Sequence, residues 1–162
     1  PYQVLQTLYD GLFPKGRDRC YWKSTYLKHL DNEVIREITK NLTWRPSDMT
    51  YASIWKFGGA VQRITGDATA FGDRSMPFML SLDAIWSNAS EDDANISWVR
   101  DVWHAMQPHS TGRMYLNFPG LGEGDNLVQN AFGAETYARL QQVKRKYDPD
   151  NVFRMNQNVL PQ

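Results

Sequence analysis

Three asparagines near the end of the chain are its best candidates for ligand contacts. Asn117 lies in the run of residues 115–118, and Asn156 and Asn158 lie in a polar stretch that follows residue 148. An Asn amide carries both donors and an acceptor, which suits hydrogen bonding to a polar ligand. Each residue also has a local alternative: Asn117 can fix the adjoining Pro119-Gly120 loop, and the other two can bond neighbouring backbone.

Composition excludes several classes of protein. The 162 residues carry 18 Lys and Arg and 18 Asp and Glu, so the net charge of zero favours neither nucleic acid nor an anionic membrane as a partner. No apolar run reaches spanning length, and no signal-peptide pattern follows Pro1. Cys20 is the one cysteine and the three histidines lack ligand spacing, so we expect no metal site.

Aromatic content is the unusual feature of the composition, at 13% with six Trp. Aromatic side chains bury a large area each, so they can line a pocket for a flat ligand or simply fill a core.

The elements that must position these residues follow from periodicity. Strands are predicted for residues 19–27, 53–57, 60–65, 77–86 and 114–118, with Gly58-Gly59 as a hairpin or bulge between the second and third. In residues 77–86 the apolar side chains alternate with Ser81 and Asp83, so one face of that strand is buried.

Helices are predicted where apolar residues recur every three to four positions. One follows the cap Asp31, a second follows a capping box at Ser90 and Asp93, and a third covers residues 134–147 and ends at Asp148-Pro149. The remaining residues form an extended tail. This order predicts an α+β fold, a mostly antiparallel sheet flanked by helices with an extended C-terminal tail.

The second half of the chain resembles the substrate domain and C-terminal segment of the berberine bridge enzyme-like FAD-linked oxidoreductases. The matching pieces, in order, are Gly58-Gly59-Ala60 with Arg63, Ala68-Thr69-Ala70-Phe71 with Arg74, Trp86, Trp98-Val99-Arg100, Tyr115-Leu116-Asn117-Phe118, Tyr137-Ala138-Arg139-Leu140 and residues 144–158. Single pieces are weak signals, whereas their order over this length is a strong one.

The resemblance implies a fragment of a two-domain flavoprotein whose N-terminal FAD-binding domain is absent. Residues 1–112 would then be a partial substrate-binding domain, and residues 113–162 a C-terminal segment that packs on the FAD domain of the same polypeptide. Tyr115, Asn117, Asn156 and Asn158 become the cofactor-binding candidates. A bacterial homologue would be cytoplasmic, although a targeting signal upstream of Pro1 stays open.

Enzymes of this kind oxidise a C–H bond next to oxygen or nitrogen by hydride transfer to the flavin, and dioxygen commonly reoxidises it. The implied partner is a small-molecule substrate. The fragment alone is expected to be inactive, and its exposed apolar sheet face predicts self-association.

One departure from the family leaves the catalytic residue unknown. Several relatives carry Tyr as the proposed base where this chain has Phe118, which has no proton-accepting atom. Tyr21, Lys23 and Tyr26 are candidates only if their strand faces the flavin. A catalytic base supplied by the absent FAD domain is an equal alternative. An amine substrate that binds without its extra proton would require no catalytic base.

Two other functions remain as alternatives. The first is a non-catalytic α+β module that binds a ligand on an aromatic-lined sheet face, and the second is a structural domain that packs on a partner. The ordered motifs and the extended tail favour the oxidoreductase.

Overall fold

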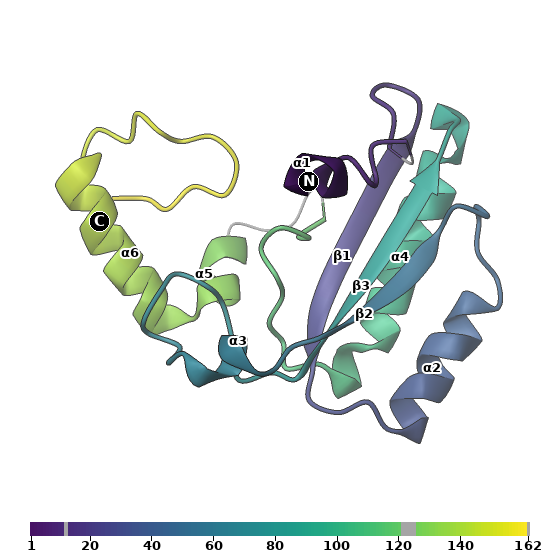
Figure 1. Ribbon diagram of the computed structural model, residues 1–162, viewed down its shortest axis with the longest axis horizontal. Helices are drawn as coiled ribbons and strands as arrows, with labels where there is room; N and C mark the ends of the chain where they lie inside the picture. Colours follow the sequence, from purple (N-terminus) through teal and green to yellow (C-terminus); the bar gives the residue numbers. More distant parts are fainter. Residues whose placement is uncertain (12, 121–125, 162) are drawn as a thin grey trace.

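The computed structural model describes residues 1–11, 13–120 and 126–161, and it confirms the α+β class (Figure 1). One three-stranded antiparallel sheet has the order β1-β3-β2, with β1 at Arg19–Leu27, β2 at Tyr51–Lys56 and β3 at Phe78–Trp86. The α-helices are α1 (Tyr2–Gln6), α2 (Asn32–Leu42), α3 (Ala60–Arg63), α4 (Asp92–Ala105), α5 (Leu127–Phe132) and α6 (Ala134–Tyr147), with short 3₁₀ turns at Ala89–Glu91 and Gln107–His109.

Two helices cover one face of the sheet, and the core lies beneath them. Leu80, Leu82, Ala84 and Trp86 of β3 alternate onto this face and pack against Val99 and its neighbours on α4. Helix α2 adds Val34 and Ile38, and the Asp31 carboxylate accepts hydrogen bonds from the backbone N–H groups of residues 33 and 34 as predicted. We call this the helix face and the opposite side of the sheet the open face.

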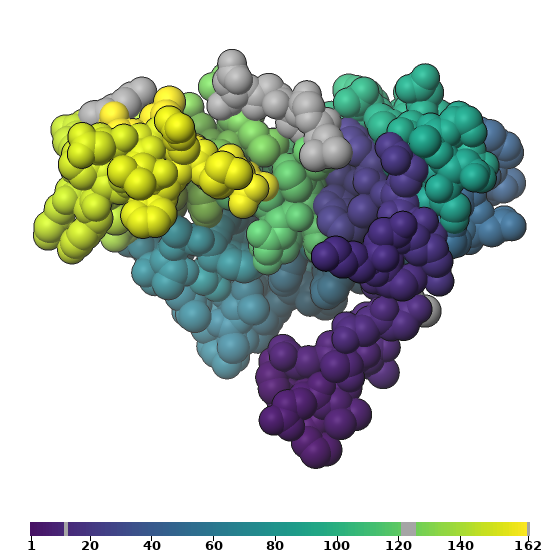
Figure 2. All heavy atoms as spheres, turned by 90° about the horizontal axis from the view of Figure 1, so that it is seen from above, coloured from purple at the N-terminus to yellow at the C-terminus, as the bar shows by residue number. Residues whose placement is uncertain are grey.

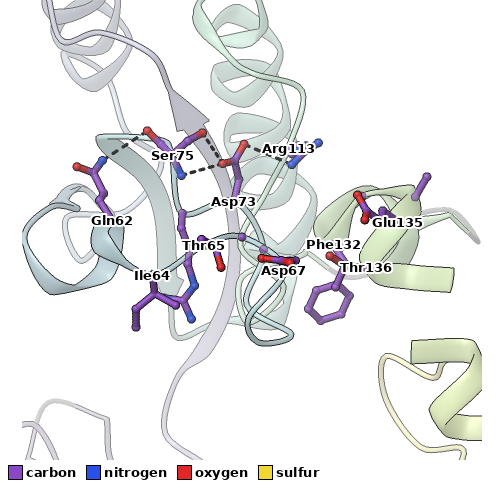
Figure 3. A pocket seen from close by; sticks show the side chains of 15 residues that line it. Gln62, Ile64, Thr65, Asp67, Asp73, Ser75, Arg113, Phe132, Glu135 and Thr136 are labelled. Atoms are coloured by element: carbon purple, nitrogen blue, oxygen red, sulfur yellow. Dashed lines mark hydrogen bonds and ion pairs between the residues drawn. The ribbon is translucent and has the colours of Figure 1, made fainter. Parts of the chain in front are cut away.

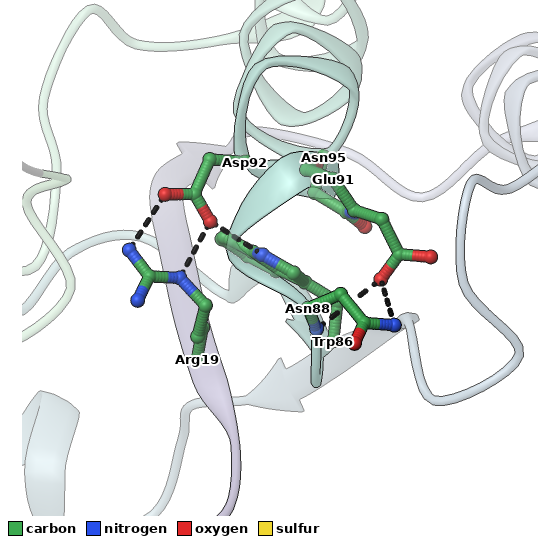
Figure 4. Close-up of polar contacts among 6 residues, drawn as sticks. All are labelled: Arg19, Trp86, Asn88, Glu91, Asp92 and Asn95. Atoms are coloured by element: carbon green, nitrogen blue, oxygen red, sulfur yellow. Dashed lines mark hydrogen bonds and ion pairs between the residues drawn. The ribbon is translucent and has the colours of Figure 1, made fainter.

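A clasp joins the ends of β1, β3 and α4 (Figure 4). The Asp92 carboxylate accepts hydrogen bonds from Arg19 Nε (2.5 Å) and Nη2 (2.6 Å) and from the indole Nε1 of Trp86 (2.7 Å). The helix begins with a capping box between Asn88 and Glu91, so the prediction that placed the box at Ser90 and Asp93 is wrong by two residues. Asn88 rather than Ser90 is the N-cap residue, because its extended backbone leads directly from the end of β3 into the first helical turn.

Acid should weaken this clasp. The hydrogen bond from Arg19 holds the pKa of Asp92 below its ordinary value of 3.8. A carboxyl group whose pKa is lower in the folded state than in the unfolded state stabilises the fold. This stability is fully present at pH values above the unfolded-state pKa, and it is lost as the pH falls through the folded-state pKa. We therefore expect Asp92→Asn to lower the unfolding temperature at pH 7, with a smaller difference from wild type at pH 2–3.

Thermal unfolding of wild type, Asp92→Asn and Asp93→Asn at pH 7 and near pH 2.5 checks this. Asp93 is the matched control because it lies in the same first turn but is exposed. An Asp92→Asn deficit that stays constant over this pH range would contradict the assignment.

The predicted strand at residues 60–65 is wrong. Gly59 has φ of +55° and starts the short helix α3, in which Val61 N–H bonds Gly58 C=O and Arg63 N–H bonds Gly59 C=O. The β-partner of β2 is instead β3, paired from Lys56 opposite Phe78 to Tyr51 opposite Asp83. A glycine that accepts positive φ allowed the chain to leave the sheet here rather than turn back along it.

Residues 114–118 lie along the outer edge of β1 but form no strand. Ser24 N–H bonds Phe118 C=O (3.1 Å) and Tyr26 N–H bonds Arg113 C=O (3.1 Å). The two bonded positions are two residues apart on β1 but five residues apart on the neighbouring segment. The extra residues of that segment bulge away from β1, so the regular hydrogen-bond ladder of a strand cannot form. The prediction of a strand at 114–118 is wrong for this reason.

The C-terminal part lies apart from the sheet (Figure 1). Helix α6 has the predicted bounds and ends at Asp148, whose carboxylate accepts hydrogen bonds from Lys144 Nζ and from the backbone N–H groups of Val152 and Phe153. After Asp148 the described residues form no helix or strand, and the tail loops back toward α6 (Figure 1). The tail exposes Val152, Phe153 and Met155.

The N-terminal residues stand away from the body of the molecule (Figure 2). Helix α1 has no buried residue, and the arm exposes Tyr2, Val4, Leu5, Leu8 and Tyr9. Apolar exposure on this scale usually marks a contact surface.

Candidate functional site

Cross-strand rows on the open face bring a carboxyl group between two aromatic rings. Asp83 of β3 lies directly opposite Trp22 of β1 on one side and Tyr51 of β2 on the other. The next row on the same face consists of Ser24, Ser81 and Ser53. Directly opposed residues share a face and lie close together, so hydroxyl groups line up beside the carboxyl group.

A cavity of about 250 Å³ lies over these rows, and we call it the Asp83 cavity. It is lined by Phe13, Trp22, Tyr51, Ser53, Trp55, Ser81, Asp83 and Phe118. The hydroxyl of Ser81 donates to Asp83 Oδ2 at 2.8 Å, and among the described residues no hydrogen bond reaches Oδ1. Oδ1 is therefore the carboxylate oxygen that is open to a ligand.

Burial gives Asp83 the character of a proton acceptor. It is 7% exposed, and this desolvation raises its pKa above the ordinary value, against a smaller opposing effect of the Ser81 hydrogen bond. Burial, followed by the charge of Asp83, also raises the pKa of Tyr51 and of Cys20. No ion pair within the described ranges involves Asp83, so nearby cations do not offset its basicity.

The sequence did not single out Asp83 as a site residue, although a signal was present. An acidic residue in the middle of a strand with one buried face must occupy the other face, and Asp83 alternates with Leu82 and Ala84 of the core. What the sequence could not show is that aromatic side chains of β1 and β2 cover that second face.

The candidates Tyr115 and Asn117 line a separate cavity of about 200 Å³, and only their neighbour Phe118 borders the Asp83 cavity. The Ser24 hydroxyl accepts from Tyr115 N–H (3.1 Å), which fixes the segment on β1. The Asn117 amide is exposed and donates to the Tyr115 phenol (2.8 Å), rather than bonding the Pro119-Gly120 loop. The ring of Phe118 packs edge-on to Trp22 with centroids 6.0 Å apart and forms part of the cavity wall.

The candidates Asn156 and Asn158 belong to a different part of the molecule. They lie in the tail that follows α6. Asn156 has φ of +57°, a conformation that Asn tolerates better than most residues, and its C=O accepts from Asn158 N–H (2.9 Å). No hydrogen bond within the described ranges joins the tail asparagines to Asn117, and their role in binding a cofactor stays a prediction.

The structure places the three candidate bases of β1 in different surroundings. Tyr21 lies on the helix face, where its hydroxyl accepts from Arg100 Nε (3.2 Å), and Lys23 lies on the same face above the ring of Trp103 at 4.1 Å. Tyr26 is on the opposite side of the strand but fully buried, and burial raises its pKa to about 12. A phenol with that pKa keeps its proton near neutral pH.

A second, polar hollow of about 440 Å³ lies between α3 and the start of α6 (Figure 3). Two of its charged groups bond one another: Asp73 pairs with Arg113 (3.4 Å) and also accepts hydrogen bonds from the backbone and hydroxyl of Ser75 (2.9 and 2.6 Å). Asp67, Arg74 and Glu135 line the same hollow.

Within the described parts of the chain, no three His, Cys, Asp or Glu residues are grouped as metal ligands would be. The helices of the same parts are all too short or too polar to cross a membrane.

Comparison with known proteins finds the same relatives by sequence and by structure. Residues 114–160 match the family model described as berberine and berberine like. The uncharacterized FAD-linked oxidoreductase YvdP of Bacillus subtilis (strain 168) is 41% identical over 132 residues, which is 79% of this chain and 27% of the relative. Berberine bridge enzyme-like 17 of Arabidopsis thaliana is 28% identical over 170 residues, covering 91% of this chain and 31% of the relative.

The fold agrees with that of solved members. The wild-type BBE-like 1 protein of Physcomitrella patens superposes with a TM-score of 0.78 at 22% identity, covering 95% of this chain and 33% of that structure. The chain thus spans about a third of the length of the proteins that it matches. Residues 114–160 thus carry the berberine-like domain of this family, and the relatives found for the chain are berberine bridge enzyme-like proteins and FAD-linked oxidoreductases.

Proposed function

We propose that this chain forms the substrate side of an FAD-dependent oxidoreductase that oxidises a C–H bond next to oxygen or nitrogen, with Asp83 as the proton acceptor. The observation that carries the proposal is the buried carboxyl group of Asp83, which lies on the open sheet face between Trp22 and Tyr51 with one oxygen free. A base held out of water in a partly apolar cavity is suited to take a proton at moderate pH.

The residues around the cavity fit the ring system of FAD. The rings of Trp22 and Phe118 suit a flat heterocycle, and the exposed amide of Asn117 offers donors and an acceptor beside them. We assign the phosphates and ribityl chain to the two thirds of the relatives that this chain does not match. Residues 113–162 would dock on that portion through Val152, Phe153 and Met155.

Each residue then has a defined task. FAD, when bound, supplies the hydride acceptor, and dioxygen is the final acceptor in this proposal. The substrate hydroxyl donates a hydrogen bond to Asp83 Oδ1 and transfers its proton there as the carbonyl group forms. Ser81 holds the carboxylate in position through Oδ2, while Trp22 and Tyr51 exclude water and pack against the substrate ring.

A visible spectrum tests the proposal. We expect the purified product of the complete open reading frame to show flavin absorption bands near about 370 and 450 nm, whereas the 162-residue chain should bind FAD weakly. Consumption of dioxygen with an alcohol or amine substrate would support the oxidase activity. A colourless full-length product, even after incubation with FAD, would defeat the proposal and favour the non-catalytic binding module.

A further inference from the structure

The hydroxyl of Ser24 joins residues 115–118, which we call the edge segment, to the sheet. Ser24 is 1% exposed and lies on the open face of β1, directly opposite Ser81 of β3. Its Oγ accepts a hydrogen bond from Tyr115 N–H (3.1 Å), and its O–H can donate to the C=O of Phe118 (3.2 Å) or of Tyr115 (3.3 Å). One buried side chain therefore bonds both ends of the edge segment.

The backbone of Ser24 bonds its neighbours at the same outer edge of β1. Its N–H donates to Phe118 C=O (3.1 Å), and its C=O accepts from the indole Nε1 of Trp103 on α4 (3.1 Å). Since these groups point away from β3, Ser24 and Ser81 form a non-hydrogen-bonded cross-strand pair, the kind in which side chains lie closest. Ser24 thus links the edge segment, α4 and a serine that lines the Asp83 cavity.

The edge segment presents two groups to the proposed flavin site. Phe118 forms part of the wall of the Asp83 cavity, with its ring centroid 6.0 Å from that of Trp22. The amide of Asn117 is exposed and donates to the Tyr115 phenol (2.8 Å). The edge segment is not a strand, so no regular ladder of hydrogen bonds fixes these groups. Their placement depends on the few bonds to Ser24.

We propose that Ser24 is a positioning residue of the flavin site. Its hydroxyl holds the edge segment against β1, so that Phe118 closes the Asp83 cavity and Asn117 lies beside the flavin ring. The inference rests on the proposed function for the flavin, whereas the anchoring of the edge segment does not. Without the hydroxyl, Tyr115 N–H loses its acceptor, and a partly buried donor left unpaired favours movement of the segment into water.

Hydrogen–deuterium exchange tests the anchoring. In the product of the complete open reading frame, Ser24→Ala should let the amide of Tyr115 exchange at least about fivefold faster than in wild type, because its hydrogen bond is lost. Mass spectrometry of peptides that cover residues 113–118 measures this rate. Ser24→Thr keeps the hydroxyl in a side chain that suits a strand, so it should restore slow exchange. Exchange that Ser24→Ala does not change would overturn the proposal.

Thr25→Val is the matched control. Thr25 is 2% exposed on the same strand, but its hydroxyl bonds Ser110 (2.5 Å) and Arg113 C=O (3.4 Å), which lie before the edge segment. Val keeps the shape of the side chain, so this variant loses a buried hydroxyl of β1 without removing a bond of the edge segment. Exchange at Tyr115 should stay at the wild-type rate. A rise equal to that in Ser24→Ala would show general loosening of β1 and overturn the proposal.

The flavin spectrum tests the positioning. In the flavin-loaded enzyme, Ser24→Ala should shift the absorption band near about 450 nm, because displacement of Phe118 and Asn117 changes the surroundings of the ring. Thr25→Val and Ser24→Thr should leave the band at its wild-type position. Where Ser24→Ala does not fold, Ser24→Cys replaces it, since a thiol is of similar size but bonds only weakly.

The two measurements separate this inference from the proposed function. Faster exchange with an unshifted flavin band would overturn the positioning role of Ser24, and it would leave the flavin and the role of Asp83 intact. A product without flavin that still shows the expected exchange pattern would defeat the proposed function and leave the anchoring by Ser24 in place.

Discussion

Asp83→Asn should lower kcat at least about 100-fold in the flavin-loaded enzyme, since a positioned base typically contributes 10² to 10⁴. Asn keeps the size of the side chain and can still accept the hydrogen bond from Ser81, which donates at 2.8 Å to the native carboxylate. It cannot take a proton from the substrate. KM should change little, because the cavity walls formed by Trp22 and Tyr51 remain.

The pH profile and the stability provide the checks on this result. In the wild-type enzyme kcat should increase with pH as Asp83 loses its proton, at a pH above the ordinary carboxyl range. The Asp83→Asn variant should not show this increase on the acidic side of the profile. Because the pKa of Asp83 is higher in the folded state than its ordinary value of 3.8, ionising this buried group destabilises the fold. The loss of stability begins as the pH rises above 3.8. Asp83→Asn should therefore unfold at a higher temperature than wild type at pH 7 and at a similar one at pH 3.

Unchanged kcat in Asp83→Asn would remove Asp83 from the mechanism. Asp93→Asn serves as the matched control, because Asp93 lies exposed on α4 and away from the open face. Lost activity together with a lowered unfolding temperature at pH 7 would show that the substitution damages the fold, and it would contradict the buried-charge argument.

Leu80→Ala should destabilise the fold by about 3 kcal/mol, among the larger costs expected for a single residue. Leu80 is fully buried in the middle of β3 on the helix face, where it belongs to the core cluster with Val99 and Val102 of α4. Truncation removes apolar contacts and leaves a cavity that neighbouring strands on either side prevent from collapsing. Urea unfolding followed by circular dichroism measures the change.

Ile54→Ala is the control for Leu80→Ala. Ile54 pairs directly with Leu80 on the same face, but it lies on the edge strand β2 and is 43% exposed. Its truncation should cost only about 1 kcal/mol, because much of its surface already faces water. Equal losses for the two variants would mean that another part of the protein covers the β2 edge as fully as β1 covers the other side of β3.

Local periodicity explains which elements could be predicted from the sequence. Strand β1 and helix α6 have the predicted bounds, and β3 differs by one residue at its start. In β3 and α6 one period, two residues for the strand and 3.6 for the helix, persists over nine residues or more, so a burial pattern is visible without knowledge of partners. Strand β1 was predictable from its aromatic and threonine content instead. The family could be recognised for a related reason, because its motifs keep their order along the chain.

Short elements were mispredicted because distant residues decide them. Residues 60–65 have strand-like composition, yet β3 supplies the partner of β2 and Gly59 turns the intervening chain into α3. Residues 114–118 alternate like a strand, but only Ser24 and Tyr26 of β1 hold them and the spacing forces a bulge. In both cases tertiary hydrogen bonds override a weak local preference.

The sequence by itself determined the fold class, the family and the face of β3 on which Asp83 must lie, because alternation along one strand is a local property. Only the tertiary structure placed Trp22 and Tyr51 beside Asp83 and put Tyr21 and Lys23 on the helix face of the sheet. Those relations depend on the register between strands that are 30 to 60 residues apart, which hydrogen bonding and core packing fix only when the sheet assembles.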